Sequence, residues 1–275
     1  MNNTILVVEN GINTSYIDSL LFALFYKESH IQNILYQQTD KNIFMYLQDM
    51  IHNNFVYPIR SGFSISSSIL NEIRNYSYLC GWKNNCNILD LYNVSEYFEF
   101  IMNGFSKNLI NIDIMEINHK TNTQMMKSIE CNFIELTITE NNDIKYLLKD
   151  WENNITPNKH IYYNFKEVPM TLTIYLNRFT EATTNFSKID IKRKLKFYKN
   201  KDDKQTNFYW NIHSIICFSN SGSGSYYSLI NMGNNNWYIF NNANIPSISK
   251  IDISEDDIST KIMQECVFLI YNIND

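Results

Sequence analysis

The sequence has no closely paired cysteines of the kind that bind zinc or form a disulfide framework. It has five cysteines, an odd number, and none of them forms a CxxC pair. Unpaired, reduced thiols are typical of the cytosol, so we expect a cytoplasmic protein with free cysteines. The five are Cys80, Cys86, Cys131, Cys217 and Cys266.

Long apolar runs are also missing. No stretch approaches the roughly 20 apolar residues that a helix needs to cross a bilayer. The first ten residues have no basic start, and their apolar run, Ile5–Val8, is only four residues long. Such a run is too short for a signal peptide. We therefore expect neither a membrane partner nor a cleaved leader.

A third absence is an excess of basic residues. The formal net charge is −5, and the Lys and Arg residues form no stripe, which argues against nucleic acid as a partner. No linker rich in Pro, Gly or Ser and no internal repeat divides the chain. Apolar residues make up 44% of it and aromatic residues 15%, enough for a core. We predict one globular domain over residues 1–275.

Hydrophobic periodicity divides this domain into a helical part, about 10–105, and a β-rich part, about 109–272. Helices followed by antiparallel strands are typical of the α+β class. The acidic cluster at 252–257 is interpreted as a solvated loop. The predicted helices cover 15–27, 29–38, 41–52, 65–76, 93–103 and 142–151, and the predicted strands cover 110–114, 133–138, 168–179, 189–197, 209–218, 225–232, 236–240 and 266–272.

Ser15 lies where a polar turn meets an apolar helix. Asn13 and Thr14 are residue types that cap helices, and the apolar residues after them recur at helical spacing, so a helix should begin at or just before Ser15. The free N–H groups and the positive dipole end of that helix would stabilise a thiolate. A serine gains little there, because a hydroxyl is too weak an acid to ionise.

Two segments near opposite ends of the chain carry patterns of one protein family. Residues 10–21 read N-G-I-N-T-S-Y-I-D-S-L-L, and residues 222–242 read G-S-G-S-Y-Y-S-L-I-N-M-G-N-N-N-W-Y-I-F-N-N, a predicted hairpin. They resemble the cysteine box, N-x-G-N-T-C-Y-x-N-S-x-L, and the histidine box, G-H-Y-x-x-Y then W-Y-x-F-[ND]-D, of the ubiquitin-specific proteases. The strands predicted over 168–217 and 266–271 resemble those of the same family. Gly11 stands one place early, and Asp18 replaces an asparagine.

The resemblance implies a papain-like fold in which a helical thumb packs on a β-sheet palm with attached fingers. In this family the fingers often bind zinc through two CxxC pairs. Cys131 has no second ligand nearby, and four tetrahedral ligands cannot be assembled from the sequence. We therefore expect reduced fingers, no structural metal and no other cofactor.

The resemblance also implies roles for four polar residues. Ser15 takes the position of the nucleophile, Ser225 that of the general-base histidine, Asn241 that of the group that orients the histidine, and Asn10 that of the oxyanion-hole donor. Asn242 stands where the family commonly has Asp. Hydrolysis needs a thiolate and an imidazole, and loss of a general base alone lowers a rate by about 10²–10⁴. Both groups are missing from these positions.

These substitutions predict a catalytically inactive relative that is kept as a protein-binding or structural module. Its expected partner is ubiquitin, a ubiquitin-like protein or a viral structural protein. The abundance of Asn and Ile is typical of AT-rich genomes, such as those of large DNA viruses. Poxvirus core proteins contain a decayed domain of this type. If the protein is viral, we therefore expect it in the virion. The alternative is an active deubiquitinase that hydrolyses ubiquitin isopeptide bonds with a rebuilt nucleophile and base. His213 is then the best candidate base, although a strand histidine usually has only a structural place.

Overall fold

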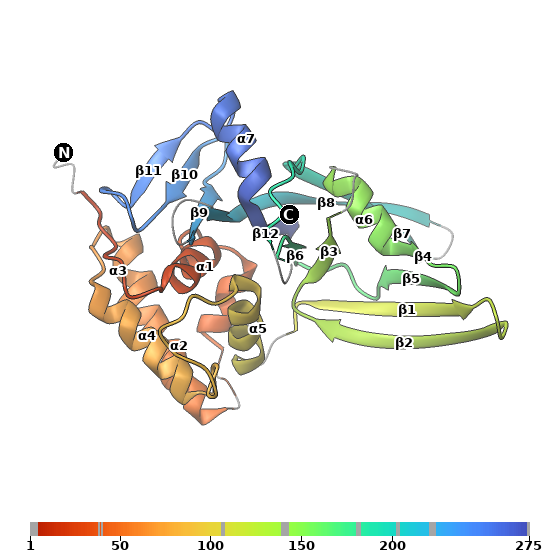
Figure 1. The fold of residues 1–275 in the computed structure, drawn as a ribbon, viewed down its shortest axis with the longest axis horizontal. Helices are drawn as coiled ribbons and strands as arrows, with labels where there is room; N and C mark the ends of the chain where they lie inside the picture. Colours follow the sequence, from red (N-terminus) through yellow and green to blue (C-terminus); the bar gives the residue numbers. More distant parts are fainter. Residues whose placement is uncertain are drawn as a thin grey trace. The chain divides into compact units, whose positions relative to one another are not determined.

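The computed structural model describes residues 5–37, 39, 41–105, 108–138, 143–179, 183–201, 204–219 and 224–273, and between 198 and 206 the backbone alone. The chain forms two compact units (Figure 1). Unit 1 contains Met1–Lys107 and His213–Phe268, and unit 2 contains Asn108–Ile212 and Leu269–Asp275. Both segments that resemble the protease boxes belong to unit 1. The single domain over 1–275 stays a prediction.

The helices of unit 1 come mainly from the first hundred residues. Their core helix is α1 (Ser15–Phe25), and all of its residues are buried. A helix that is buried all round lies inside a domain and not on its surface. The other helical elements are the 3-10 helix η1 (His30–Leu35), α2 (Asn42–Met50), the π-helix η2 (Ile51–Val56), α3 (Tyr57–Arg60), α4 (Ser67–Leu79), α5 (Val94–Gly104) and α7 (Asp256–Glu265).

The sheet of unit 1 is antiparallel and has the order β11-β10-β9-β8. It consists of β9 (Ser225–Asn231), β10 (Trp237–Phe240), β11 (Ile248–Ile251) and the last part of β8 (Lys204–Ser219). The predicted hairpin at 225–240 forms. Its turn contains Gly233, Asn234 and Asn235 at positive φ, a conformation for which Gly and Asn are best suited.

Helix α1 lies between this sheet and the other helices (Figure 1). On the sheet side, the rings of Phe22 and Phe240 stack with centroids 4.7 Å apart, and the Ser214 hydroxyl donates to the Ala23 carbonyl over 2.8 Å. On the helical side, Tyr16 makes an edge contact with Tyr97 at 5.3 Å. The sheet therefore fixes where the first residue of α1 lies.

Unit 2 contains the segment in which the resemblance places the fingers. Strands β1 (Ile110–Asn118), β2 (Thr123–Cys131), β4 (Asn153–Ile155) and β5 (Lys159–Phe165) form an antiparallel sheet of order β2-β1-β5-β4. Helix α6 (Ile144–Glu152) precedes β4. Strand β3 (Ile134–Thr137) pairs in parallel with β6 (Thr171–Asn177), and β7 (Lys194–Lys201) pairs with the first part of β8. The last strand, β12 (Cys266–Ile273), is divided between the units.

The α+β class predicted from the sequence is confirmed, with differences in detail. The segment 29–38 contains a 3-10 helix, and the helix predicted over 41–52 continues through η2 and past Pro58, which lies in the first turn of α3, where proline is tolerated. The acidic cluster is only partly a loop, because Asp256 and Asp257 form the first turn of α7. Carboxylates stabilise that end of a helix. No described helix is both long and apolar enough to span a bilayer.

Candidate functional site

The helix that carries Ser15 begins at the predicted residue but without the predicted cap. Thr14 precedes α1, and neither its side chain nor that of Asn13 caps the helix. Asn13 has a φ of 52°, and its Nδ2 donates to the Leu89 carbonyl over 2.8 Å. The hydroxyl of Thr14 is buried and has no hydrogen-bond partner among the described residues. The start of α1 is thus set by tertiary contacts of the preceding turn.

Helix α4 holds that turn. The Arg74 guanidinium donates to the carbonyl of Ile12, and the Asn71 side chain accepts from the Ile12 N–H over 3.4 Å. Gly11 approaches Thr14 so closely that a Cβ at position 11 would lie 2.7 Å from the threonine hydroxyl. A glycine is therefore required here by the close approach, although it stands one place earlier than in the protease pattern.

Ser15 meets the second segment directly. The Tyr226 backbone N–H donates to the Ser15 Oγ over 3.1 Å, and only 4% of Ser15 is exposed. Just before β9, Gly224 has a φ of +78°, and a Cβ there would lie 2.5 Å from the Phe218 ring. Both observations require glycine at 224 and explain the Gly that the histidine-box pattern contains. The two segments that resemble the protease boxes therefore converge.

A second contact joins the segments through a buried amide and a buried carboxyl group. Asn242 Nδ2 donates to Asp18 Oδ2 and also to Asn10 Oδ1, the latter over 3.2 Å. Asp18 is fully buried, and this burial raises its pKa from 3.8 to about 7, although the hydrogen bonds from Asn242 and Ser19 act in the opposite direction. None of the roles predicted from the sequence falls on Asp18. The sequence indicates this contact only through two differences from the protease pattern: Asp stands in place of Asn at 18, and Asn stands in place of Asp at 242.

The other two predicted positions are arranged differently. Asn241 uses its side-chain oxygen to accept from the Ala243 N–H over 3.0 Å, an Asx turn within its own loop. Ser225 is half-buried at the start of β9 and pairs with Ser219 in the ladder. The structure thus brings Ser15 next to Tyr226 and joins Asn10 to Asn242 by a hydrogen bond. The Asn241 side chain instead stabilises the turn in its own loop.

No histidine contacts Ser15 in the part of the chain that the structure describes. His213 lies beside the other end of α1, because its neighbour Ser214 donates to Ala23, eight residues or about 12 Å along the helix from Ser15. Burial, and then the charge of Lys27, lowers the pKa of His213 from 6.5 to about 3, so its imidazole is neutral at physiological pH. His30 and His52 lie in η1 and η2, and His119 and His160 belong to unit 2. The suggestion that His213 supplies the base is therefore wrong on geometry.

Asp18 and His213 give the free energy of unfolding opposite pH dependences. The folded-state pKa of Asp18 is raised, so its contribution to stability is lost as the pH rises from about 4 to about 7. The folded-state pKa of His213 is lowered, so its contribution is lost as the pH falls from about 6.5 to about 3. The two effects oppose each other over the range in which they overlap.

Asp18→Asn is expected to remove the first effect and leave the second. Compared with the unaltered protein, the variant should be more stable by about 4 kcal/mol at pH 8 and equally stable near pH 4. Urea unfolding of both proteins across this pH range measures the difference. A difference that does not change with pH would contradict the burial of an ionisable carboxyl group at position 18.

Comparison with known proteins adds two results to this geometry. A protein-family model described as ubiquitin carboxyl-terminal hydrolase matches residues 8–271. The chain belongs to this family. A search of curated protein sequences finds no significant match.

Solved structures of one DUB module share the fold. One is the SAGA DUB module Ubp8/Sgf11/Sus1/Sgf73 bound to monoubiquitin, with 14% identity, a TM-score of 0.67, and coverage of 98% of this chain and 69% of that chain. Another is the same module bound to ubiquitin aldehyde, with 14% identity, a TM-score of 0.68, and coverage of 98% and 70%. At this identity the likeness establishes the fold alone.

The described part of this family member contains no group of three or more His, Cys, Asp or Glu side chains placed to hold a metal ion. Cys131 ends β2 and is half-buried, whereas Cys80 and Cys86 belong to unit 1.

Proposed function

We propose that this chain is a catalytically inactive member of the ubiquitin carboxyl-terminal hydrolase family that binds ubiquitin, or a ubiquitin-like protein, through its C-terminal tail without cleaving it. The observation that carries the proposal is the environment of the Ser15 hydroxyl. Its hydrogen-bond partner is a backbone N–H, and no imidazole contacts it among the described residues. A serine hydroxyl needs an adjacent base to become a nucleophile.

The remaining polar groups favour binding over chemistry. Asn10 accepts from Asn242 through its Oδ1, so its Nδ2 is the end that is left to donate to a peptide carbonyl oxygen. Such a donor holds a carbonyl group whether or not the bond beside it is cleaved. Two solved structures of the same fold have ubiquitin or ubiquitin aldehyde bound, which supports ubiquitin as the class of partner.

Titration of ¹⁵N-labelled ubiquitin with this protein, followed by NMR, tests the proposal. We expect chemical-shift changes at the C-terminal tail of ubiquitin that saturate in the micromolar to millimolar range, about −4 to −8 kcal/mol. Asn10→Arg should weaken them at least about tenfold, because a long cation replaces the amide donor at the exposed end of the site.

Asn75→Arg is the matched control, since Asn75 is also exposed in unit 1 but lies on α4. It should leave the titration unchanged. Absence of any shift in ubiquitin, or equal weakening by the two variants, would contradict tail binding at the Ser15 segment.

A further inference from the structure

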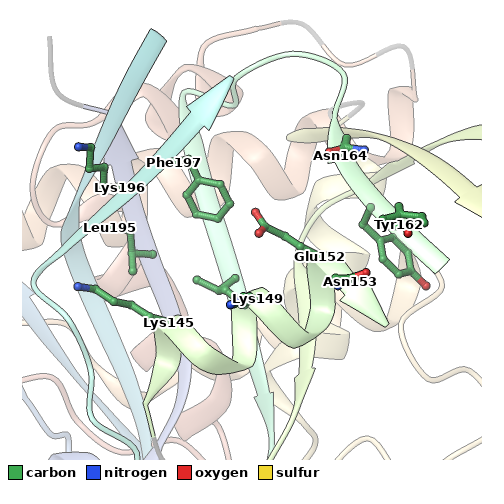
Figure 2. Close-up of a pocket in the computed structure, with 11 residues that line it drawn as sticks. Lys145, Lys149, Glu152, Asn153, Tyr162, Asn164, Leu195, Lys196 and Phe197 are labelled. Carbon is green, nitrogen blue, oxygen red and sulfur yellow. The ribbon is translucent and has the colours of Figure 1, made fainter. Parts of the chain in front are cut away.

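Unit 2 contains a hollow of about 660 Å³ that none of the roles described above uses (Figure 2). One wall is a single face of α6, because its four lining residues are spaced by three and four positions. The opposite walls come from β5 and β7. The volume lies in the range of sites that hold a ligand of several hundred daltons. The lining residues are Lys145, Leu148, Lys149, Glu152, Asn153, Tyr162, Tyr163, Asn164, Leu195, Lys196 and Phe197.

Both strands beside the hollow are incompletely paired within the described structure. Strand β5 pairs with β1, but on its other side β4 covers only the residues from His160 to Tyr162. Tyr163 and Asn164 therefore lie on an edge that faces the hollow. Strand β7 pairs with β8, and no second neighbour is found for it in the described sheets. Open strand edges take up further extended chains through backbone hydrogen bonds.

Glu152 places a carboxylate inside the hollow. Figure 2 shows this carboxylate pointing towards the ring of Phe197. The side chain is half-buried, burial raises the pKa of its carboxyl group, and no described residue forms a hydrogen bond or ion pair with it. A partly desolvated charge without a partner is unfavourable, and a cation from outside would relieve it.

The lysines around the hollow do not supply the cation that would pair with Glu152. Lys196 places its ammonium group 5.7 Å from the Tyr209 ring, away from Glu152. Lys145 and Lys149 are exposed on α6, so water and salt screen their charges. An anionic ligand would bring its charge to Glu152, whereas a basic side chain would meet both a carboxylate and the face of an aromatic ring.

We propose that the hollow binds an extended segment of a partner polypeptide and that Glu152 pairs with a Lys or Arg side chain of that segment. The backbone of the segment lies along the open edge of β5 or β7. Its alternate side chains reach Leu148, Leu195 and the Phe197 ring. This site is distinct from the Ser15 segment in unit 1 and does not depend on ubiquitin binding.

Two acetylated pentapeptide amides, Thr-Val-Lys-Val-Thr and Thr-Val-Glu-Val-Thr, test the proposal by NMR of the ¹³C-labelled leucine methyl groups. The lysine peptide should shift the methyl signals of Leu148 and Leu195 with a dissociation constant of the order of 1 mM or below, and the glutamate peptide should not. Glu152→Gln should weaken the lysine peptide about tenfold. Asp150→Asn, an exposed position on the same helix, is the matched control and should change nothing.

Equal binding of the two peptides, an unchanged affinity in Glu152→Gln, or no shift with either peptide would overturn the proposal. The comparison of the two peptides uses the unaltered protein, so the test stands even if the Glu152 variant does not fold.

Discussion

Asn242→Asp is expected to lower the free energy of unfolding by about 3–5 kcal/mol at neutral to alkaline pH. Asn242 Nδ2 donates to the buried Asp18 carboxyl group. An aspartate at 242 would replace this donor with a second carboxylate, and no lysine or arginine among the described residues is hydrogen-bonded to either position. Two carboxylates in contact cannot both ionise without a large cost, so one would hold a proton with a strongly raised pKa.

A double variant in which the two residues are exchanged is the control for this prediction. Asp18→Asn combined with Asn242→Asp restores one amide and one carboxylate across the same contact. The double variant should therefore recover to within about 1 kcal/mol of the unaltered protein. Urea unfolding of the four proteins at pH 8 measures this recovery. A double variant as unstable as Asn242→Asp would contradict the prediction, because it holds only one of the two carboxylates.

This pair accounts for two departures that look unrelated in the sequence. The ubiquitin-specific protease pattern has Asn at the position of Asp18 and commonly Asp at the position of Asn242. The chain carries the reverse arrangement, and the structure places the two side chains in contact. An exchange of the two residue types leaves one amide and one carboxyl group to form a hydrogen bond between the segments.

Most of the fold that positions Ser15 follows from local sequence patterns. The first residue of α1 and the turn with Gly233 between β9 and β10 are predictable from nearby residues, although tertiary contacts take the place of the predicted helix cap. Strand β2 escaped prediction because almost all of it is exposed, so its side chains do not alternate between apolar and polar. Helix α7 escaped because its acidic first turn has the composition of a loop.

The candidate site could be predicted only in part. The sequence shows that residues 15 and 225 are both serines. It therefore predicts that the thiol and the imidazole needed for hydrolysis are missing from these positions. Which asparagine of the pair 241–242 points inward depends on the turn after β10, where Asn241 binds the Ala243 N–H. The link from Asn242 to Asp18 spans more than two hundred residues and depends on tertiary packing. Local patterns contain no information on such a contact.

The double variant Ser15→Cys with Ser225→His is expected to gain hydrolytic activity towards a ubiquitin C-terminal amide. A cysteine at the start of α1 has the free N–H groups and the dipole of the helix to stabilise its thiolate. A histidine at 225 would be next in the chain to Tyr226, whose N–H contacts residue 15. Because Asn241 does not orient that histidine, we expect a gain near the lower end for a general base, about 10² over either single variant.

Hydrolysis of a ubiquitin C-terminal amide, measured side by side for the unaltered protein, the two single variants and the double variant, tests the central claim most directly. The loss of both the thiol and the imidazole predicts no turnover by the unaltered protein and measurable turnover by the double variant alone. Turnover by the unaltered protein at a rate equal to or above that of the double variant would contradict the claim that this site has lost its proton acceptor.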